Sequence, residues 1–190
     1  FIVKKILFDV KNQGDKAVIK YEKKFSNIKS NHKKIKFSKE EINKISKKVG
    51  KNLKRSIDIA FARIKRFHLE QKTTPFKYKD KYNNELTYRY SSIDRVGVYV
   101  PGGTASYPST VLMNCIPALV AGVRNIYLTT PSLGSLVNPA IIYAAKKCGV
   151  KEIYKTGGAH SIAAFTYGTK TFKKVDKIVG PGNMYVASAK

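Results

Sequence analysis

Short apolar runs and amphipathic segments alternate regularly in the second half of the chain, and this alternation constrains the fold more than any other feature. Four apolar runs have the length and composition of strands, and they span residues 96–100, 126–130, 152–156 and 177–179. Each is followed by a turn containing glycine or proline and then by a helical segment, at 108–121, 138–148, 159–167 and 183–190. Candidate helix C-caps are Gly122, Gly149 and Gly168. Four consecutive βα units predict an α/β fold with a parallel sheet and helices on its faces.

Residues 1–90 follow a helical period instead. Apolar side chains recur at helical spacing from Val10 through Gly14 to Phe25, with lysines on the other side, which predicts an amphipathic helix. Ser38 followed by Glu41 is a capping box, so a second helical segment is expected to begin there and to run to residue 72, with Gly50 as a possible break. A first strand is expected near 86–90. The chain therefore divides into a mainly helical region, 1–90, and the βα units of 91–190.

The strong positive charge suggests a nucleic-acid partner at first sight. The 190 residues include 37 Lys+Arg against 12 Asp+Glu, a net charge of +25. Almost all of the basic residues are lysine, whereas base and phosphate recognition favours arginine. A lysine-rich, isoleucine-rich and asparagine-rich composition is typical of proteins from AT-rich genomes. We therefore do not expect nucleic acid as the main partner, although a basic nucleic-acid-binding module remains an alternative.

Neither a membrane segment nor a metal or disulfide framework is indicated. The longest apolar stretch, 111–128, is interrupted by Asn114, Pro117 and Arg124, and no secretory signal opens the chain, so a cytoplasmic protein is expected. The two cysteines, Cys115 and Cys148, lie in apolar runs without metal-ligand spacing, which favours buried, reduced thiols. Both ends lie within helical patterns, and we expect the sequence to be part of a longer protein.

Three of the four loops that follow the predicted strands contain paired glycines. In an open parallel sheet these loops meet at one edge, where ligands bind. The loops are Pro101-Gly102-Gly103-Thr104, Thr130-Pro131-Ser132, Gly157-Gly158-Ala159-His160 and Gly180-Pro181-Gly182-Asn183. Tight turns alone explain one glycine pair, but three pairs at one edge indicate a binding site, with helix N-termini available to an anion such as a pyrophosphate. Tyr99, His160 and Asn183 are the candidate ligand contacts, each with packing or capping as the alternative.

The sequence lacks the features that would place the chemistry itself in this chain. Neither GxGxxG nor GxxxxGK[ST] occurs, so neither standard nucleotide-binding fingerprint applies. No two of the three histidines have metal-ligand spacing, and none of the four loops contains an acidic residue. We therefore assign no catalytic and no metal-binding residue. We expect this part of the protein to bind a ligand rather than to catalyse a reaction.

The same segments resemble the histidinol dehydrogenase family. The resemblance rests on ordered blocks in the second half, namely Val96-Gly97-Val98-Tyr99-Val100-Pro101-Gly102-Gly103-Thr104-Ala105, Pro108-Ser109-Thr110-Val111-Leu112-Met113, Ile116-Pro117-Ala118, Gly157-Gly158-Ala159, Ala163-Ala164, Tyr167-Gly168-Thr169 and Lys174-Val175-Asp176-Lys177-Ile178-Val179-Gly180-Pro181-Gly182-Asn183. Gly14-Asp15, Tyr21 and Phe25 are also similar to the family's first helix, so the resemblance covers essentially the whole chain. It implies a Rossmann-like, aldehyde-dehydrogenase-like α/β fold preceded by a helical region. It also implies a homodimer that uses zinc and NAD to oxidise L-histidinol in two steps to L-histidine.

The resemblance also assigns roles to individual positions. Tyr99, His160 and Asn183 match the family's NAD-contacting positions, although the family usually has Gln where this sequence has His160, and imidazole lacks the paired donor and acceptor of an amide. The family's catalytic residues and zinc ligands are expected downstream of Lys190, because this chain corresponds to the N-terminal part of a family member. An inactive remnant, or one half of a split enzyme, remains an alternative.

Overall fold

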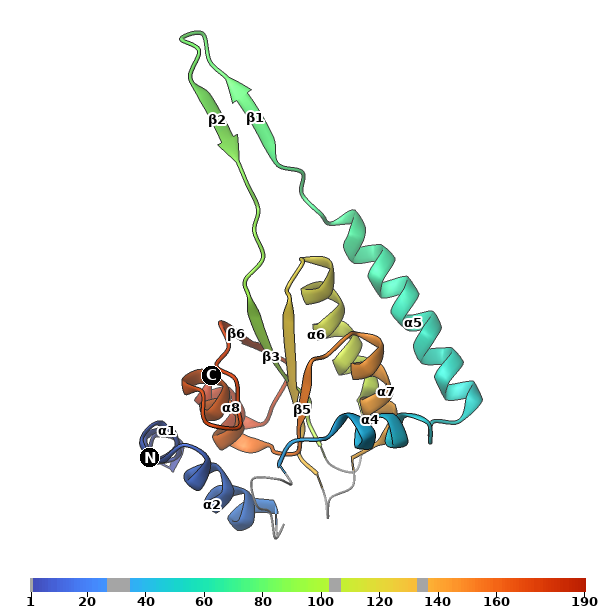
Figure 1. Cartoon of the computed structure of the whole chain (residues 1–190), viewed down its shortest axis with the longest axis vertical. Coiled ribbons are helices and arrows are strands. Elements are labelled where there is room, and N and C mark those ends of the chain that lie inside the picture. Colours follow the sequence, from blue (N-terminus) through green and yellow to red (C-terminus); the bar gives the residue numbers. More distant parts are fainter. Residues whose placement is uncertain (1, 27–34, 103–106, 133–136) are drawn as a thin grey trace.

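A parallel four-stranded sheet with helices on both faces forms the body of the molecule (Figure 1). The computed structural model describes residues 2–26, 35–102, 107–132 and 137–190. The strands are β3 (Arg95–Tyr99), β4 (Asn125–Thr129), β5 (Glu152–Tyr154) and β6 (Lys177–Val179). They are hydrogen-bonded in the order β5-β4-β3-β6, and every pair is parallel. The predicted fold class and all four predicted strands are confirmed.

The helices of the second half lie where the sequence predicts them. They are α6 (Pro108–Val120), α7 (Pro139–Lys147), α8 (Gly158–Tyr167) and α9 (Met184–Ala189). The three candidate C-cap glycines all have positive φ, between 71° and 90°. Because side chains alternate along a strand, each sheet face has its own core. Val98, Leu128 and Ile153 pack with α6 and α7, while Tyr99, Tyr127 and Tyr154 pack with α8 and α9.

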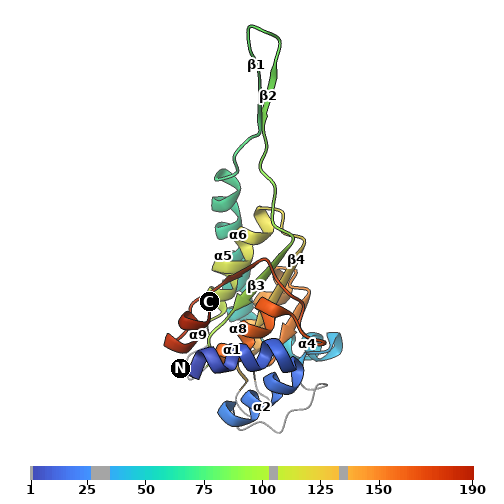
Figure 2. The ribbon, with the colours of Figure 1, turned by 90° about the vertical axis from the view of Figure 1, so that its left-hand side faces the viewer.

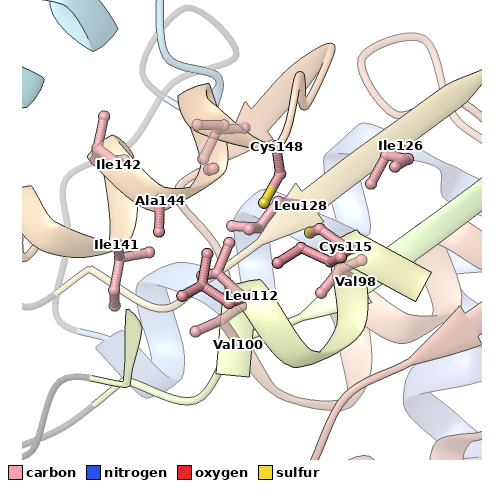
Figure 3. Close-up of a cluster of buried hydrophobic side chains, with 14 of the residues drawn as sticks. Val98, Val100, Leu112, Cys115, Ile126, Leu128, Ile141, Ile142, Ala144 and Cys148 are labelled. Carbon is pink, nitrogen blue, oxygen red and sulfur yellow. The ribbon is translucent and has the colours of Figure 1, made fainter. Parts of the chain in front are cut away.

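Both cysteines belong to the core between the sheet and helices α6 and α7. Figure 3 shows Cys115 and Cys148 among the aliphatic side chains of this cluster, beside Leu128. Both are buried free thiols, as predicted. A hydrogen bond with Cys148, together with burial, raises the pKa of the Cys115 thiol well above its ordinary value. The protonated thiol is the unreactive form, so this pair serves packing.

The amphipathic segment at the N-terminus forms two helices rather than one. They are α1 (Ile2–Gln13) and α2 (Asp15–Ser26), and Gly14 between them has a φ of +55°. A right-handed helix cannot continue through that backbone conformation, which glycine adopts more readily than other residues. The prediction of a continuous helix from Val10 to Phe25 is therefore wrong at Gly14. Both helices pack against α8, on the face of the sheet opposite α6 and α7.

The second helical segment divides at Gly50, as the sequence suggested. Helix α4 (Lys39–Ser46) begins with the predicted capping box, in which Ser38 Oγ accepts from the Glu41 N–H and Glu41 accepts from the Ser38 N–H. Gly50 is then the N-cap of α5 (Lys51–Glu70). Helix α4 packs on α7 and helix α5 on α6, so the N-terminal helices complete both faces of the sheet. No helix in the described ranges combines the length and apolarity needed to cross a bilayer.

A β-hairpin projects from the body between α5 and β3. Its strands are β1 (Phe76–Lys79) and β2 (Glu85–Tyr88), which pair antiparallel. The strand expected near 86–90 is thus present as β2, but it belongs to this hairpin, and the sequence analysis did not predict β1. In the two views of Figures 1 and 2 the hairpin extends away from every other labelled element. Every residue of both strands is exposed.

Candidate functional site

A cavity of about 510 Å³ lies at the carboxyl edge of the sheet. From β3 the chain adds β4 and β5 on one side and then crosses to place β6 on the other, so the strand order reverses between β3 and β6. Such a switch point leaves a crevice outside the strand ends, where ligands of open α/β sheets bind. The loops after β3, β4, β5 and β6 all contribute residues to the cavity.

The N-terminal helices supply an apolar wall of this cavity. Ile2 and Ile6 come from α1 and Phe25 comes from α2. The remaining lining residues belong to the end of β3, to the strand-end loops and to the starts of α8 and α9, and they include all three candidate contacts, Tyr99, His160 and Asn183. A mainly apolar cavity of this size with a few polar groups is typical of a site for a small molecule or cofactor.

Tyr99 connects the end of β3 with the start of α8. Its side chain is only 4% exposed, and its hydroxyl oxygen accepts a hydrogen bond of 3.3 Å from the Gly158 N–H. Burial, with a contribution from the charge of Glu22, raises the pKa of the Tyr99 hydroxyl above its ordinary value. The phenol therefore stays protonated at neutral pH. Since the oxygen already accepts from Gly158, the O–H proton is the part left to donate to a ligand.

His160 lines the cavity, and its imidazole ring is hydrogen-bonded to the carboxylate of Glu22. Its side chain is 2% exposed, and Nε2 lies 2.8 Å from Oε2 of Glu22. The ring also stacks on Tyr21 and Phe25 of α2, with centroids 6.2 Å apart in each case. The sequence analysis considered His160 only as a ligand contact or as a packing or capping residue. The structure adds an acidic partner on α2.

Glu22 is the residue of this site that the sequence analysis missed. It is fully buried, and the same oxygen that meets His160 also accepts a hydrogen bond from Thr156 Oγ1. These two partners, Thr156 and His160, lie on either side of the Gly157-Gly158 turn. Contacts with one carboxylate therefore hold both ends of that turn against α2. The signal in the sequence was helical spacing, because Glu22 falls on the same helix face as Val18 and Phe25.

Asn183 is the N-cap of α9, which was its alternative role. Its Oδ1 accepts from the backbone N–H groups of Tyr185 and Val186, each at 3.1 Å. The side chain is exposed, and its Nδ2 makes no hydrogen bond to the residues that the structure describes. Capping uses only the amide oxygen, so the amide nitrogen remains available to a ligand in the cavity.

The paired glycines allow the strand-end loops to pack against one another. A side chain at Gly157 would collide with the ring of Pro131, and one at Gly180 would collide with the backbone carbonyl of Tyr99. Gly180 also has a φ of +107°, which strongly favours glycine. These two glycines thus bring the loops together around the cavity. Gly103 and Thr104 lie outside the described residues.

The described ranges contain no metal-binding cluster. No three His, Cys, Asp or Glu side chains among them come close enough to hold an ion. The nearest approach to an acid–base pair is Glu22 with His160, at the cavity wall. Because both side chains are enclosed by protein, this pair fastens the loop and leaves no exposed base.

Relatives of this chain share its sequence over nearly its whole length. A family model described as histidinol dehydrogenase matches residues 2–190. A curated histidinol dehydrogenase of Pelagibacter ubique (strain HTCC1062) is 51% identical over 186 residues, which are 98% of this chain and 42% of that relative. One from Sulfurisphaera tokodaii is 47% identical over 188 residues, which are 99% of this chain and 46% of that relative.

Solved structures agree with these matches. The crystal structure of histidinol dehydrogenase from Elizabethkingia anophelis matches with a TM-score of 0.92 at 41% sequence identity, and the match covers 100% of this chain and 43% of that one. The chain thus spans less than half the length of the relatives it matches. Since sequence and fold agree from one end of the chain to the other, it belongs to the histidinol dehydrogenase family.

Proposed function

We propose that this chain forms the NAD-binding part of a histidinol dehydrogenase. In this proposal the whole enzyme oxidises L-histidinol through the aldehyde to L-histidine, and NAD, when bound, accepts the hydride of each oxidation. The observation that carries the proposal is that Tyr99, His160 and Asn183, which are far apart in the sequence, line one cavity at the switch point of the sheet. Family membership supplies the identity of the reaction.

The residues present fit a dinucleotide. The Tyr99 hydroxyl proton and the Asn183 amide nitrogen are both donors suited to ribose or phosphate oxygens. Helix α8 begins at the cavity, and the positive end of its dipole favours an anionic group such as a pyrophosphate. His160 contributes its ring to the wall while Glu22 occupies Nε2, and the side chains of Ile2, Ile6 and Phe25 offer apolar surface to a flat ring.

The described residues do not fit zinc, since no group of ligands comes together among them. We therefore attribute no step to zinc at the residues that the structure describes. The zinc ligands and the catalytic acid–base residues that the family resemblance implies are expected elsewhere in the polypeptide, beyond Lys190. We also propose a homodimer as the working assembly and the small molecule L-histidinol as substrate.

Two conservative substitutions separate ligand contact from structural roles. Tyr99→Phe removes the hydroxyl and keeps the ring, while Asn183→Asp keeps the cap oxygen but removes the amide donor. In the polypeptide as its gene encodes it, each is expected to raise the dissociation constant for NAD about three- to tenfold, the effect of one lost hydrogen bond. Isothermal titration calorimetry measures this constant directly.

Tyr127→Phe is the matched control, because Tyr127 lies on the same sheet face as Tyr99 and does not line the cavity. It should leave the dissociation constant for NAD unchanged. Thermal unfolding of all three variants should show that the fold is intact. If Tyr99→Phe and Asn183→Asp both bound NAD as the parent does, this cavity would not be the cofactor site.

A further inference from the structure

The turn between β5 and α8 borders the cavity but has no side chains to hold its own shape. It consists of Gly157 and Gly158, and α8 begins there without a side-chain cap. Gly158 has a φ of +65°, and a glycine backbone has more conformational freedom than that of any other residue. The conformation of this turn is therefore set by the residues around it.

The turn orients the hydroxyl group of Tyr99. The Gly158 N–H donates a hydrogen bond of 3.3 Å to the Tyr99 oxygen, and both residues line the cavity. A hydroxyl hydrogen rotates to suit its neighbours, and it turns away from a donor that approaches its oxygen. The position of the Gly158 N–H thus determines the direction in which Tyr99 offers its own proton.

Contacts with Glu22 hold the turn from outside the cavity. The Oε2 atom of Glu22 accepts a hydrogen bond from Thr156 Oγ1, immediately before the turn, and lies 2.8 Å from His160 Nε2, just after it. Glu22 and Thr156 are both fully buried, and neither lines the cavity. Hydrogen bonds to a carboxylate are stronger than those between neutral groups, and burial strengthens them further. Any effect of Glu22 or Thr156 on a ligand must therefore pass through the residues between them and the cavity.

The opposite side of the turn is held by the sheet. Thr129 Oγ1, at the end of β4, donates a hydrogen bond of 2.5 Å to the backbone carbonyl of Thr156. Gly157 lies so close to the ring of Pro131 that a side chain there would collide with it. The turn is thus held between the sheet and α2, and Glu22 supplies the contacts on the α2 side.

We propose that Glu22 is a positioning residue for the cofactor. Through Thr156 and His160 it holds the Gly157-Gly158 turn in place. In that place the second N–H of the turn directs the Tyr99 hydroxyl proton into the cavity. This inference rests on the proposed function and deepens it, because the direction of that proton affects affinity only if NAD binds in this cavity.

Two substitutions at Thr156 test the first link of this chain of contacts. Thr156→Val has nearly the shape of threonine but no hydroxyl, whereas Thr156→Ser retains the hydroxyl. In the polypeptide as its gene encodes it, Thr156→Val is expected to raise the dissociation constant for NAD about three- to fivefold, because a poorly oriented Tyr99 hydroxyl loses much of one hydrogen bond. Thr156→Ser should bind NAD as the parent does. Isothermal titration calorimetry gives both constants, at a temperature at which thermal unfolding shows each variant to be folded.

Glu22→Gln changes the other partner of the same hydrogen bond. The amide keeps the volume of the carboxylate but is a neutral and weaker acceptor, so the dissociation constant for NAD should rise here too. Asp15→Asn is the control for this variant. Asp15 also lies on α2, but it accepts hydrogen bonds from the hydroxyls of Thr169 and Thr171 away from the cavity, so its substitution should leave the constant unchanged.

A binding cycle separates positioning from a general loosening of the fold. In the Tyr99→Phe protein there is no hydroxyl to orient, so adding Thr156→Val should not raise the dissociation constant further. In the Asn183→Asp protein the Tyr99 hydroxyl is intact, so Thr156→Val should raise the constant by the same factor as in the parent. A loosened fold would instead raise the constant in both backgrounds.

Equal rises in the two backgrounds would show that Glu22 does not act through the Tyr99 hydroxyl, and no rise for Thr156→Val would show that it does not act on NAD binding at all. Either result overturns the inference and leaves the proposed function standing, since Tyr99→Phe and Asn183→Asp test that function separately. If Tyr99→Phe itself left the constant unchanged, Glu22 would have no hydroxyl to position. The inference would then fall even where Asn183→Asp upheld the cofactor site.

Discussion

At the scale of single residues, the carboxylate of Glu22 joins α2 to the Gly157-Gly158 turn after β5. It is buried without exposure and meets both Thr156 and His160. Glu22→Ala would leave both partners buried without their acceptor, and we expect it to lower the free energy of unfolding by about 2–4 kcal/mol. Urea unfolding measures the loss. The free energy of unfolding of Asp15→Asn serves as the comparison. Asp15 lies on the same helix as Glu22, but it accepts hydrogen bonds from threonine hydroxyls away from the cavity.

A double-mutant cycle tests whether Glu22 and His160 act as a pair. Glu22→Gln and His160→Gln each disturb the hydrogen bond, whereas together they place two amides where they can bond to each other. The cost of His160→Gln is therefore expected to be smaller in the Glu22→Gln protein, by more than about 0.5 kcal/mol. Additive costs would mean that the two side chains are neighbours without an energetic link.

The site illustrates which residues a sequence reveals. That Tyr99, His160 and Asn183 line one cavity was predictable, because each lies at the end of a recognisable strand or just after it and the carboxyl ends of parallel strands meet. Glu22 was not, because it precedes His160 by 138 residues and its helix carries no motif that announces which loop it will meet. Buried polar partners from distant elements depend on tertiary packing, which local patterns do not encode.

At the scale of elements, Gly14 determines where the first helix ends. Its φ of +55° costs a residue with a Cβ about 1–2 kcal/mol, so Gly14→Ala should lower the free energy of unfolding by that amount. Gly50→Ala is the matched control, because Gly50 has a φ of −61° and open space where a Cβ would stand. Urea unfolding should show a smaller loss for Gly50→Ala than for Gly14→Ala, because at Gly50 only the preference of the N-cap for glycine over alanine is lost. An equal loss in both variants would contradict this account of the break.

The contact between α5 and α7 is expected to weaken in acid. Asp58 on α5 accepts from Tyr143 Oη at 2.7 Å and pairs with Lys147 Nζ at 2.8 Å. The hydrogen bond from Lys147, followed by that from Tyr143, lowers the pKa of Asp58 below its ordinary value of 3.8. A carboxylate with a lowered folded-state pKa stabilises the protein above its ordinary pKa, and this stabilisation is lost as the pH falls through the folded-state value. Melting temperatures from about pH 3 to pH 7 should therefore fall less steeply at the acid end for Asp58→Asn than for the parent.

Regular elements with clear caps were predictable, and interrupted ones were less so. The capping box at Ser38 and the glycine C-caps mark helix ends by local hydrogen bonding, which short sequence windows contain. Strand β1 has only four residues, and its lysines alternate with Phe76 and Tyr78 in a segment without a glycine turn. The turn instead uses Asn83 with a φ of 68°. Asparagine adopts that conformation less often than glycine, so the hairpin signal was weak.

At the scale of the whole molecule, we expect NAD binding to reduce the local opening of both α1 and the start of α9. The cavity is lined by residues from Ile2 to Tyr185, so a ligand there contacts both α1 and the start of α9. Hydrogen–deuterium exchange of the gene-encoded polypeptide should slow in both of these segments when NAD is added. Exchange in β1 and β2, which lie outside the cavity, is the internal control and should not respond. Protection limited to the strand-end loops would show that α1 is only a passive wall.

The position of α1 and α2 also has a consequence during synthesis. These helices leave the ribosome before the surface on which they pack, because α8 is about 150 residues further along the chain. At about 5–20 residues per second, that interval lasts from about 8 to about 30 seconds. Throughout it the apolar side chains of Val10, Ala17 and Val18, all buried in the finished protein, have no native partner on α8. The nascent chain therefore exposes the apolar sides of α1 and α2 until α8 has been made, and slower translation of the residues between them would prolong that exposure.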